Sequence, residues 1–318
     1  MPQMHMCPDR VIRVACAIAS IAAGLLVLGP VASLSPLGAQ QPAGPSKPIP
    51  IRVADTSQVQ VIRLGDGSSI VGRVTEVGAD TVRFTTAYGA LSIARADIVE
   101  LREVEKTEMR RGEVWPVNPN ATRLLFAPTG RMLGKGEGYF NDTYLFLLSA
   151  HGGLTSRFTL GGGLSVLPLD DFSDNALFIM PKIGVVATPK FNLAVGALAG
   201  IVGAAVDDGE DGSFGVLYAV GTAGSPDASV TFGTGLAYAG GEFADRPVAM
   251  LGAETRLGRR VAFVTENYLV PNEDVSSVLS YGLRFFGEKL SADLAFWIAP
   301  GQDIPFPGVP YVAFSVKF

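Results

Sequence analysis

"PYVAFSVKF", residues 310–318, ends the sequence and indicates how the chain folds. Val312, Phe314, Val316 and Phe318 alternate with smaller or polar residues, which is the period of a β-strand with two different faces. The last residues of a soluble domain are seldom held in place. We therefore expect this segment to pair along its whole length with another strand, in a sheet that closes into a barrel.

Two stretches upstream show the same alternation more fully. "SVTFGTGLAY", residues 229–238, places large apolar side chains such as Phe232 and Leu236 on one face and small residues on the other. "FTLGGGLSV", residues 158–166, repeats the pattern. Large apolar residues on one side and small or polar residues on the other are typical of a transmembrane barrel strand.

The connections between these apolar runs alternate in character. Five are short: "LTSR", "TPK", "SPDA", "GRR" and "GEK". Between them lie longer and mostly acidic ones: "PLDDFSDN", "DDGEDG", "GGEFADRP", "VPNEDVSS" and "APGQDIPFPGVP". Bacterial outer-membrane barrels have short periplasmic turns and longer extracellular loops. This phase predicts that Phe318 lies at the periplasmic side.

Counting back in this phase predicts twelve strands, with ten as the alternative. The predicted fold class is all-β: a twelve-stranded antiparallel transmembrane barrel over residues 122–318. A helix at 193–206, "LAVGALAGIVGAAV", is the rival for one strand, but it is too short to span a bilayer. The strands are expected near 122–133, 139–150, 158–167, 176–187, 191–204, 214–224, 229–239, 248–257, 261–270, 276–286, 290–299 and 310–318.

The first forty residues have the pattern of an export signal. Arg10 and Arg13 precede an apolar run that ends at Pro30, and small residues follow. An uncleaved anchor helix is the alternative. Cleavage after residue 39 leaves 23 Lys+Arg, 29 Asp+Glu and no cysteine. Disulfides, thiolate chemistry and a basic nucleic-acid footprint are then excluded.

Between the signal and the barrel we expect a proline-rich linker (41–57), a small β-domain (58–104) and a second linker (105–121). Closely spaced turns such as Gly65-Asp66-Gly67 divide the domain into short strands. Its pattern "RLGDGSSIVGRVTEVGADTVRFTT" resembles Sm-like and SH3-like barrels. The resemblance implies a small barrel of the kind that binds RNA or peptides. Because no RNA is expected outside the cytoplasm, we predict a periplasmic spacer or a module that docks a protein partner.

Two further resemblances concern the barrel. "NPNATRLLFAPTGRMLGKGEGYF", residues 118–140, is similar to the opening of uncharacterised outer-membrane proteins. The outward set Val312, Phe314, Val316 and Phe318 resembles the signal that barrel-assembly machinery reads in such proteins. These resemblances imply outer-membrane lipid and that machinery as partners.

The sequence offers no convincing site for chemistry. Without the signal peptide the chain has one histidine, His151, and Ser149 lies about 6–7 Å from it along a strand. Nucleophilic catalysis needs direct hydrogen-bond reach. "DDGEDG", residues 207–212, lacks the ligand spacing of a calcium loop. We therefore predict no catalytic, cofactor-binding or metal-binding residues.

Charged residues at inward positions are the most specific feature. In "YGLRFF" and "SADLAFWI" the large apolar residues share one face, which leaves Arg284 and Asp293 on the other. A tight turn at Glu288-Lys289 would bring these two side chains opposite each other. We interpret the inward charges as a cross-linked lumen; separate hydration in a water-filled pore is the alternative. The full inward set is Lys182, Glu254, Arg256, Arg284, Asp293 and Lys317.

The leading hypothesis is a non-enzymatic outer-membrane barrel with a periplasmic N-terminal domain, either a narrow pore or a structural protein of the envelope. An outer-membrane hydrolase acting on lipid and a soluble secreted adhesin are the alternatives.

Overall fold

The computed structural model describes residues 51–318, except 54, 56–57, 106–108, 111–112, 170, 208–210, 271–276 and 288. The predicted signal peptide and most of the first linker lie outside the described residues. The described chain consists of two compact units, and the boundary between them in the sequence falls between Val117 and Asn118.

The smaller unit contains a five-stranded antiparallel sheet in the order β4-β3-β2-β1-β5. The strands are β1 (Gln58–Leu64), β2 (Ser69–Val77), β3 (Thr81–Thr86), β4 (Gly89–Ala94) and β5 (Ile98–Glu105), with a 3-10 turn at Arg95–Asp97. Ile62, Val74, Val82 and Phe84 form its core with Ile93 and Ile98. Two short strands of two residues each, β6 (Met109–Arg110) and β7 (Glu113–Val114), follow and pair with each other. The resemblance of this unit to Sm-like and SH3-like barrels stays a prediction.

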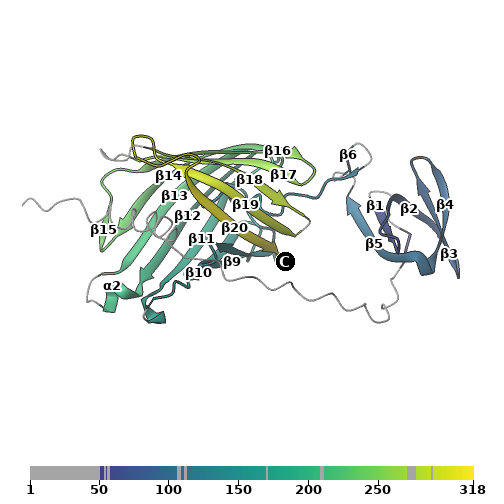
Figure 1. The fold of residues 1–318 in the computed structure, drawn as a ribbon, viewed down its shortest axis with the longest axis horizontal. Helices are drawn as coiled ribbons and strands as arrows, with labels where there is room; N and C mark the ends of the chain where they lie inside the picture. The colour runs from purple at the N-terminus through teal and green to yellow at the C-terminus, as the bar shows by residue number, and fades with distance from the viewer. Residues whose placement is uncertain are drawn as a thin grey trace, which may run out of the picture. The chain divides into compact units, whose positions relative to one another are not determined.

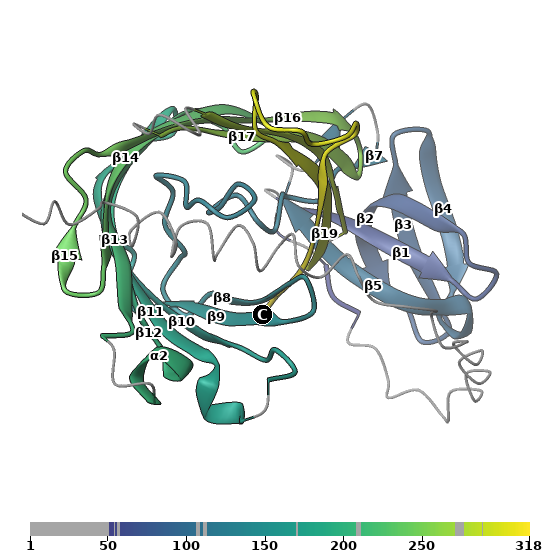
Figure 2. The ribbon, with the colours of Figure 1, turned by 60° about the vertical axis from the view of Figure 1, so that its left-hand side comes forward.

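The larger unit is a closed antiparallel barrel of twelve strands in the described part of the chain (Figures 1 and 2), which confirms the predicted fold class. The strands are β8 (Gly138–Thr143), β9 (Leu147–Gly153), β10 (Phe158–Ser165), β11 (Ala176–Ala187), β12 (Phe191–Val202), β13 (Ser213–Ser225), β14 (Ala228–Ala239), β16 (Val248–Gly258), β17 (Val261–Leu269), β18 (Ser277–Phe286), β19 (Leu290–Ile298) and β20 (Val309–Lys317).

The described strands form a closed ring. Strand β20 pairs with β8 from Lys317 opposite Tyr139 to Ala313 opposite Thr143, and β13 pairs with β14. Short elements decorate one end: β15 (Glu242–Phe243), helix α2 (Gly203–Asp207) and a 3-10 turn at Phe172–Asp174. No helix in the described ranges is long and apolar enough to cross a membrane.

Large apolar side chains point outward from the wall and remain exposed. Leu177, Ile183, Leu217, Leu251 and Phe285 are examples, each with between 44% and 59% of its surface exposed. The inward face is polar and buried, with serine, threonine and charged side chains. An apolar exterior around a polar interior is the arrangement of a transmembrane barrel.

Two strand predictions were wrong. Residues 122–133 contribute only an isolated bridge between Arg123 and Pro128 and do not belong to the wall. The predicted strand 139–150 is instead two strands, β8 and β9, joined by a turn at 144–146. The other ten predicted strands, from residue 158 onward, coincide with β10 to β20 within a few residues. The total is still twelve, because residues 122–133 do not form a wall strand and residues 139–150 belong to two strands instead of one.

Candidate functional site: a luminal segment held by buried charges

Residues 118–133, here called the luminal segment, run through the inside of the barrel before β8 begins. Figure 2 shows this stretch in blue-green within the ring of strands. Its tip is a tight turn, in which the Leu124 N–H donates to the Ala127 carbonyl at 2.8 Å and the Thr129 N–H to the Thr122 carbonyl at 2.9 Å. Pro128 and Gly130 within this stretch are poor strand residues. The wall satisfies several of the other backbone groups, among them the N–H groups of Leu125, Phe126 and Ala127.

Arg284 on β18 is the centre of a buried charge cluster. It lies opposite Asp293 of β19 in the strand register, and its Nε donates to Asp293 Oδ1 at 2.7 Å. Its Nη1 donates to Glu254 Oε2 of β16 at 3.1 Å. Arg123 of the luminal segment makes a second ion pair with Asp293, at 3.1 Å. Two arginines and two carboxylates thus neutralise one another where water is excluded, as buried charges require.

The same guanidinium also binds the backbone of the luminal segment. Arg284 Nη1 donates to the carbonyls of Asn120 and Arg123, both at 3.2 Å, and Nη2 donates to the carbonyl of Leu124 at 2.5 Å. The Arg284 side chain has no exposed surface. Because these donors are fixed in one plane, Arg284 holds three segment carbonyls in a single geometry.

Glu266 on β17 holds the tip of the segment. Its Oε2 accepts hydrogen bonds from the successive N–H groups of Leu125, Phe126 and Ala127, at 2.8, 3.1 and 3.0 Å. Its Oε1 accepts from the Tyr268 hydroxyl at 2.6 Å. Successive N–H groups in a turn form a concave anion site, and here a protein carboxylate occupies it.

The opposite wall holds the segment through Lys182 on β11. Its ammonium group donates to the carbonyls of Thr122, Thr129 and Arg131, at 3.4, 3.2 and 2.7 Å. Nearby, the Gly130 N–H donates to the Thr222 hydroxyl at 2.8 Å. The segment is therefore tied to both sides of the barrel.

Apolar contacts surround the tip. Leu124 and Leu125 are fully buried against Val264, Ala295 and Tyr311 of the wall. The Phe126 ring, which is 43% exposed, packs edge-on against Tyr311 with ring centroids 4.9 Å apart. The tip thus combines backbone hydrogen bonds with a small hydrophobic core inside the barrel.

The structure brings four of the six predicted inward charges, Lys182, Glu254, Arg284 and Asp293, into contact with the luminal segment. Lys182 and Arg284 bind its carbonyls directly. Glu254 accepts from the Asn118 side chain at 2.5 Å, and Asp293 pairs with Arg123.

The remaining two predicted charges lie near the short turns, where each pairs with a carboxylate. Arg256 pairs with Asp227 at 2.6 Å, and Lys317 pairs with Glu137 at 2.9 Å. The hydrogen bond from Lys317, with one from the Gly134 N–H, holds the pKa of Glu137 below its usual value.

Sequence reasoning missed Glu266 and the polar residues of the segment itself. Glu266 shares the inward face of "VAFVTENYL" with Ala262 and Val264, so the strand period could have identified it. The strand period could not have identified Arg123, because the apolar residues beside it make 122–133 resemble a strand of the wall.

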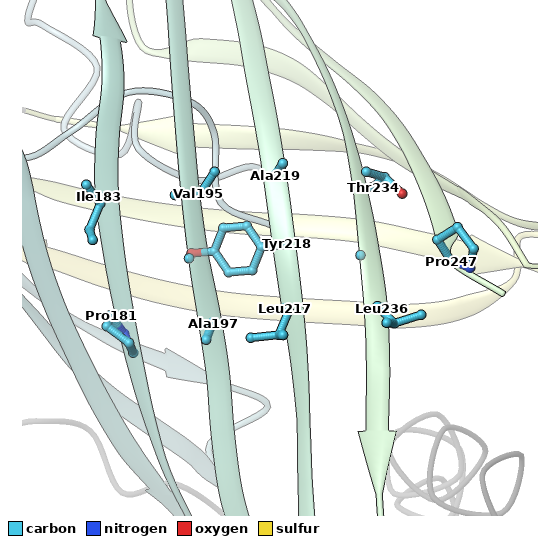
Figure 3. A pocket seen from close by; sticks show the side chains of 12 residues that line it. Pro181, Ile183, Val195, Ala197, Leu217, Tyr218, Ala219, Thr234, Leu236 and Pro247 are labelled. Atoms are coloured by element: carbon cyan, nitrogen blue, oxygen red, sulfur yellow. The ribbon is translucent and has the colours of Figure 1, made fainter. Parts of the chain in front are cut away.

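The described residues contain no arrangement for hydrolysis or metal binding around His151. Its ring stacks on Tyr139 with centroids 4.5 Å apart, and no hydrogen bond joins it to Ser149 in the described part of the chain. No group of three or more metal-ligating side chains occurs among those residues. Figure 3 shows a depression on the wall over β11 to β14, lined mostly by apolar residues such as Ile183, Val195 and Leu217, in which polar groups do not converge.

No family model and no curated protein matches this chain. Several solved structures do. The NanC porin is 7% identical with a TM-score of 0.37, over 57% of this chain and 97% of that one. A loop-deletion variant of OmpT, an outer-membrane protein of Vibrio cholerae, is 9% identical with a TM-score of 0.31, over 82% and 96%. A triple mutant of the Rhodopseudomonas blastica porin is 9% identical with a TM-score of 0.32, over 82% and 97%. Likeness at this level carries no functional information, and the fold assignment rests on the strand pairings themselves.

Proposed function

We propose that the chain is an outer-membrane β-barrel whose lumen is closed by its own residues 118–133, so that it conducts solutes poorly until this segment moves. The observation that carries the proposal is the attachment of the segment to both walls through Glu266, Arg284 and Lys182. The protein is non-enzymatic in this proposal, and no cofactor is required.

Placement in a membrane is supported by the apolar outer surface of the barrel. A soluble protein seldom exposes a continuous apolar patch larger than a few hundred Å². Here exposed Leu, Ile, Val and Phe side chains recur on strands all round the barrel. If residues 1–40 are a signal peptide, the chain is exported from the cytoplasm. The membrane that an exported barrel of this kind would occupy is the outer membrane.

Closure of the lumen is supported by the hydrogen bonds and ion pairs that join the luminal segment to the wall. Non-helical backbone at membrane depth is tolerated only where it is buried in protein or lines water, because each unsatisfied polar group costs several kcal/mol. The wall supplies carboxylate, guanidinium and ammonium groups that match the backbone groups of the segment. A segment bound in this way occupies space that solutes would otherwise use.

The orientation follows the phase of the connections. We place the short turns, Phe318 and the smaller unit in the periplasm, and the acidic loops outside the cell. Barrel-assembly machinery would then insert the chain, and a periplasmic protein would be the partner of residues 58–104. The luminal segment directly follows the smaller unit in sequence, so a partner of that unit could influence the closure.

Conductance in planar bilayers tests this proposal. We expect low or intermittent conductance for the wild-type chain, because the segment occupies the lumen. Glu266→Gln keeps the size of the side chain but removes the charge that binds three N–H groups, and Asp293→Ala removes a partner of both Arg123 and Arg284. Both variants should open more often or to higher levels. Glu242→Gln, in the short and exposed strand β15, is the matched control and should behave as wild type. A large and steady wild-type conductance that neither substitution alters would contradict the closed lumen and favour an open pore.

A further inference from the structure

The short turns of the barrel share a pattern that closure of the lumen does not explain. In four of the five turns, the residue directly before the next strand is basic and the first residue of that strand is apolar and outward. The pairs are Arg157-Phe158, Lys190-Phe191, Arg260-Val261 and Lys289-Leu290. The fifth turn has Asp227 in this position, and Asp227 pairs with Arg256.

Exposed positive charge therefore accumulates at this end. Lys135, Arg157, Lys190, Arg259, Arg260 and Lys289, here called the basic collar, are all exposed. Both acids described at this end, Glu137 and Asp227, already pair with Lys317 and Arg256. The net charge that this end offers, among the residues described there, is thus positive.

The opposite end has the opposite sign. Its described loops carry Asp171, Asp211, Glu242, Asp245 and Asp303, all exposed, and one basic residue, Arg246. Apart from Arg246 and the paired Glu137 and Asp227, the charged residues described at the two ends have opposite signs. The separation follows the axis of the barrel, along which a bilayer changes from hydrocarbon to headgroup.

We propose that the basic collar binds the headgroups of anionic phospholipids in the leaflet at the turn end. This inference rests on the proposed membrane placement but not on the closed lumen. Lysine and arginine can lay their apolar stems along a hydrophobic surface while the charged group reaches the interface. Each collar residue in the four pairs stands where the apolar wall ends, so its charge lies at the depth of lipid phosphates.

Lipid is favoured over a soluble anion because of how the charges are arranged. They are spread over separate turns around the rim, and each adjoins an outward apolar residue. A free phosphate would need several donors converging on one point. A ring of headgroups, each attached to chains that cover the wall, matches a ring of separated charges.

Thermal stability in vesicles of two compositions tests the proposal. The full chain is folded into phosphatidylcholine vesicles, with or without phosphatidylglycerol, and the loss of the compact band on detergent gels is followed with temperature. Phosphatidylglycerol should raise the midpoint of the wild-type protein at low ionic strength. The rise should disappear at about 1 M salt, where the Debye length falls to about 3 Å.

Variants locate the effect. Arg259→Gln/Arg260→Gln/Lys289→Gln should lose at least half of the rise, whereas Arg246→Gln, at the opposite end, should keep all of it. If the triple variant does not fold, Arg157→Gln/Lys190→Gln should show the same loss on another part of the collar, and the salt dependence of the wild-type protein remains decisive. The proposal would be overturned if phosphatidylglycerol did not raise the thermal midpoint of the wild-type protein, or if it raised the midpoint equally in the collar and control variants.

Two further outcomes separate the alternatives. Inorganic phosphate that stabilises the protein in pure phosphatidylcholine as much as phosphatidylglycerol does would identify a free-anion site and overturn the lipid proposal. Failure to insert into either vesicle would contradict the membrane placement itself. Normal insertion without a lipid-dependent shift would contradict the collar alone.

Discussion

Three charged residues of the lumen, Glu266, Arg284 and Lys182, bind the backbone of the luminal segment. Glu266 accepts from three N–H groups, and Arg284 and Lys182 each donate to three carbonyls of the luminal segment. A strand in the wall satisfies these groups by pairing with its neighbours, whereas an irregular segment cannot. Side chains that carry several donors or acceptors replace the missing neighbours. This requirement explains why fully buried charges occur inside the barrel.

Gly130 allows the segment to approach the wall closely. A Cβ atom at this position would lie 2.3 Å from the Asn192 carbonyl oxygen and 3.1 Å from the Thr222 nitrogen, both backbone atoms that cannot move cheaply. We expect Gly130→Ala to push the segment off β12 and β13, to lower the free energy of unfolding in urea by about 1–3 kcal/mol and to raise conductance.

Gly258→Ala is the control, since a Cβ atom there meets nothing within 4 Å. If the two alanine variants have the same stability and the same conductance, Gly130 does not hold the segment against the wall.

The sequence predicted the wall well and the luminal segment badly, for physical reasons. Ten strands follow a period of two because one face meets an apolar environment and the other a polar interior. The turn between β8 and β9 contains no residue type that would have indicated a turn in the sequence. Tyr144 and Leu145 adopt positive φ angles of 60° and 67°, a conformation for which Gly or Asn would have been the usual indication. Residues 139–150 therefore read as one strand.

Within the luminal segment, apolar residues imitate a strand. Leu124, Leu125 and Phe126 are as apolar as the wall residues, but they pack inside the barrel. Period alone cannot tell an apolar face that meets lipid from one that meets the interior. The adjacent Leu124 and Leu125 are both buried, which no strand of the wall would allow if its alternate residues face lipid.

The junction of β20 and β8 closes the barrel, and Phe318 completes it. Its N–H donates to the Gly138 carbonyl at 2.9 Å, and its carbonyl accepts from the Gly138 N–H at 3.1 Å. Its ring lies against Gly138, where a Cβ atom would be 2.5 Å from a ring carbon. Deleting Phe318 should remove most of the folded barrel from the membrane fraction, because an open sheet edge is not tolerated in lipid.

Phe318→Leu separates the two contributions of this residue. It keeps both backbone hydrogen bonds and an apolar side chain but loses the aromatic ring. We expect it to insert far better than the deletion does. Wild-type amounts of folded barrel after the deletion would show that the junction does not depend on Phe318.

At the scale of the whole molecule, a polar interior within an apolar exterior supports both the proposed membrane placement and the proposed closure of the lumen. The composition and the phase of the loops predicted the membrane setting. They could not predict closure, because closure depends on which residues before β8 enter the barrel. The inward charges Arg284 and Asp293 gave the one advance indication, and their partners became visible only in three dimensions.

Thiol labelling of the luminal segment tests the central claim, that residues 118–133 lie inside the barrel and not in its wall. Both cysteines of the sequence lie in the predicted signal peptide, so the mature chain suits single-cysteine variants. In the folded protein, a membrane-impermeant maleimide should label Phe126→Cys but neither Leu124→Cys nor Leu125→Cys, and all three should react after denaturation. A lipid-soluble maleimide should give the same pattern, since none of these positions faces lipid. If Leu124→Cys and Phe126→Cys both react with the lipid-soluble reagent while Leu125→Cys does not, the segment is a strand of the wall and the account is contradicted.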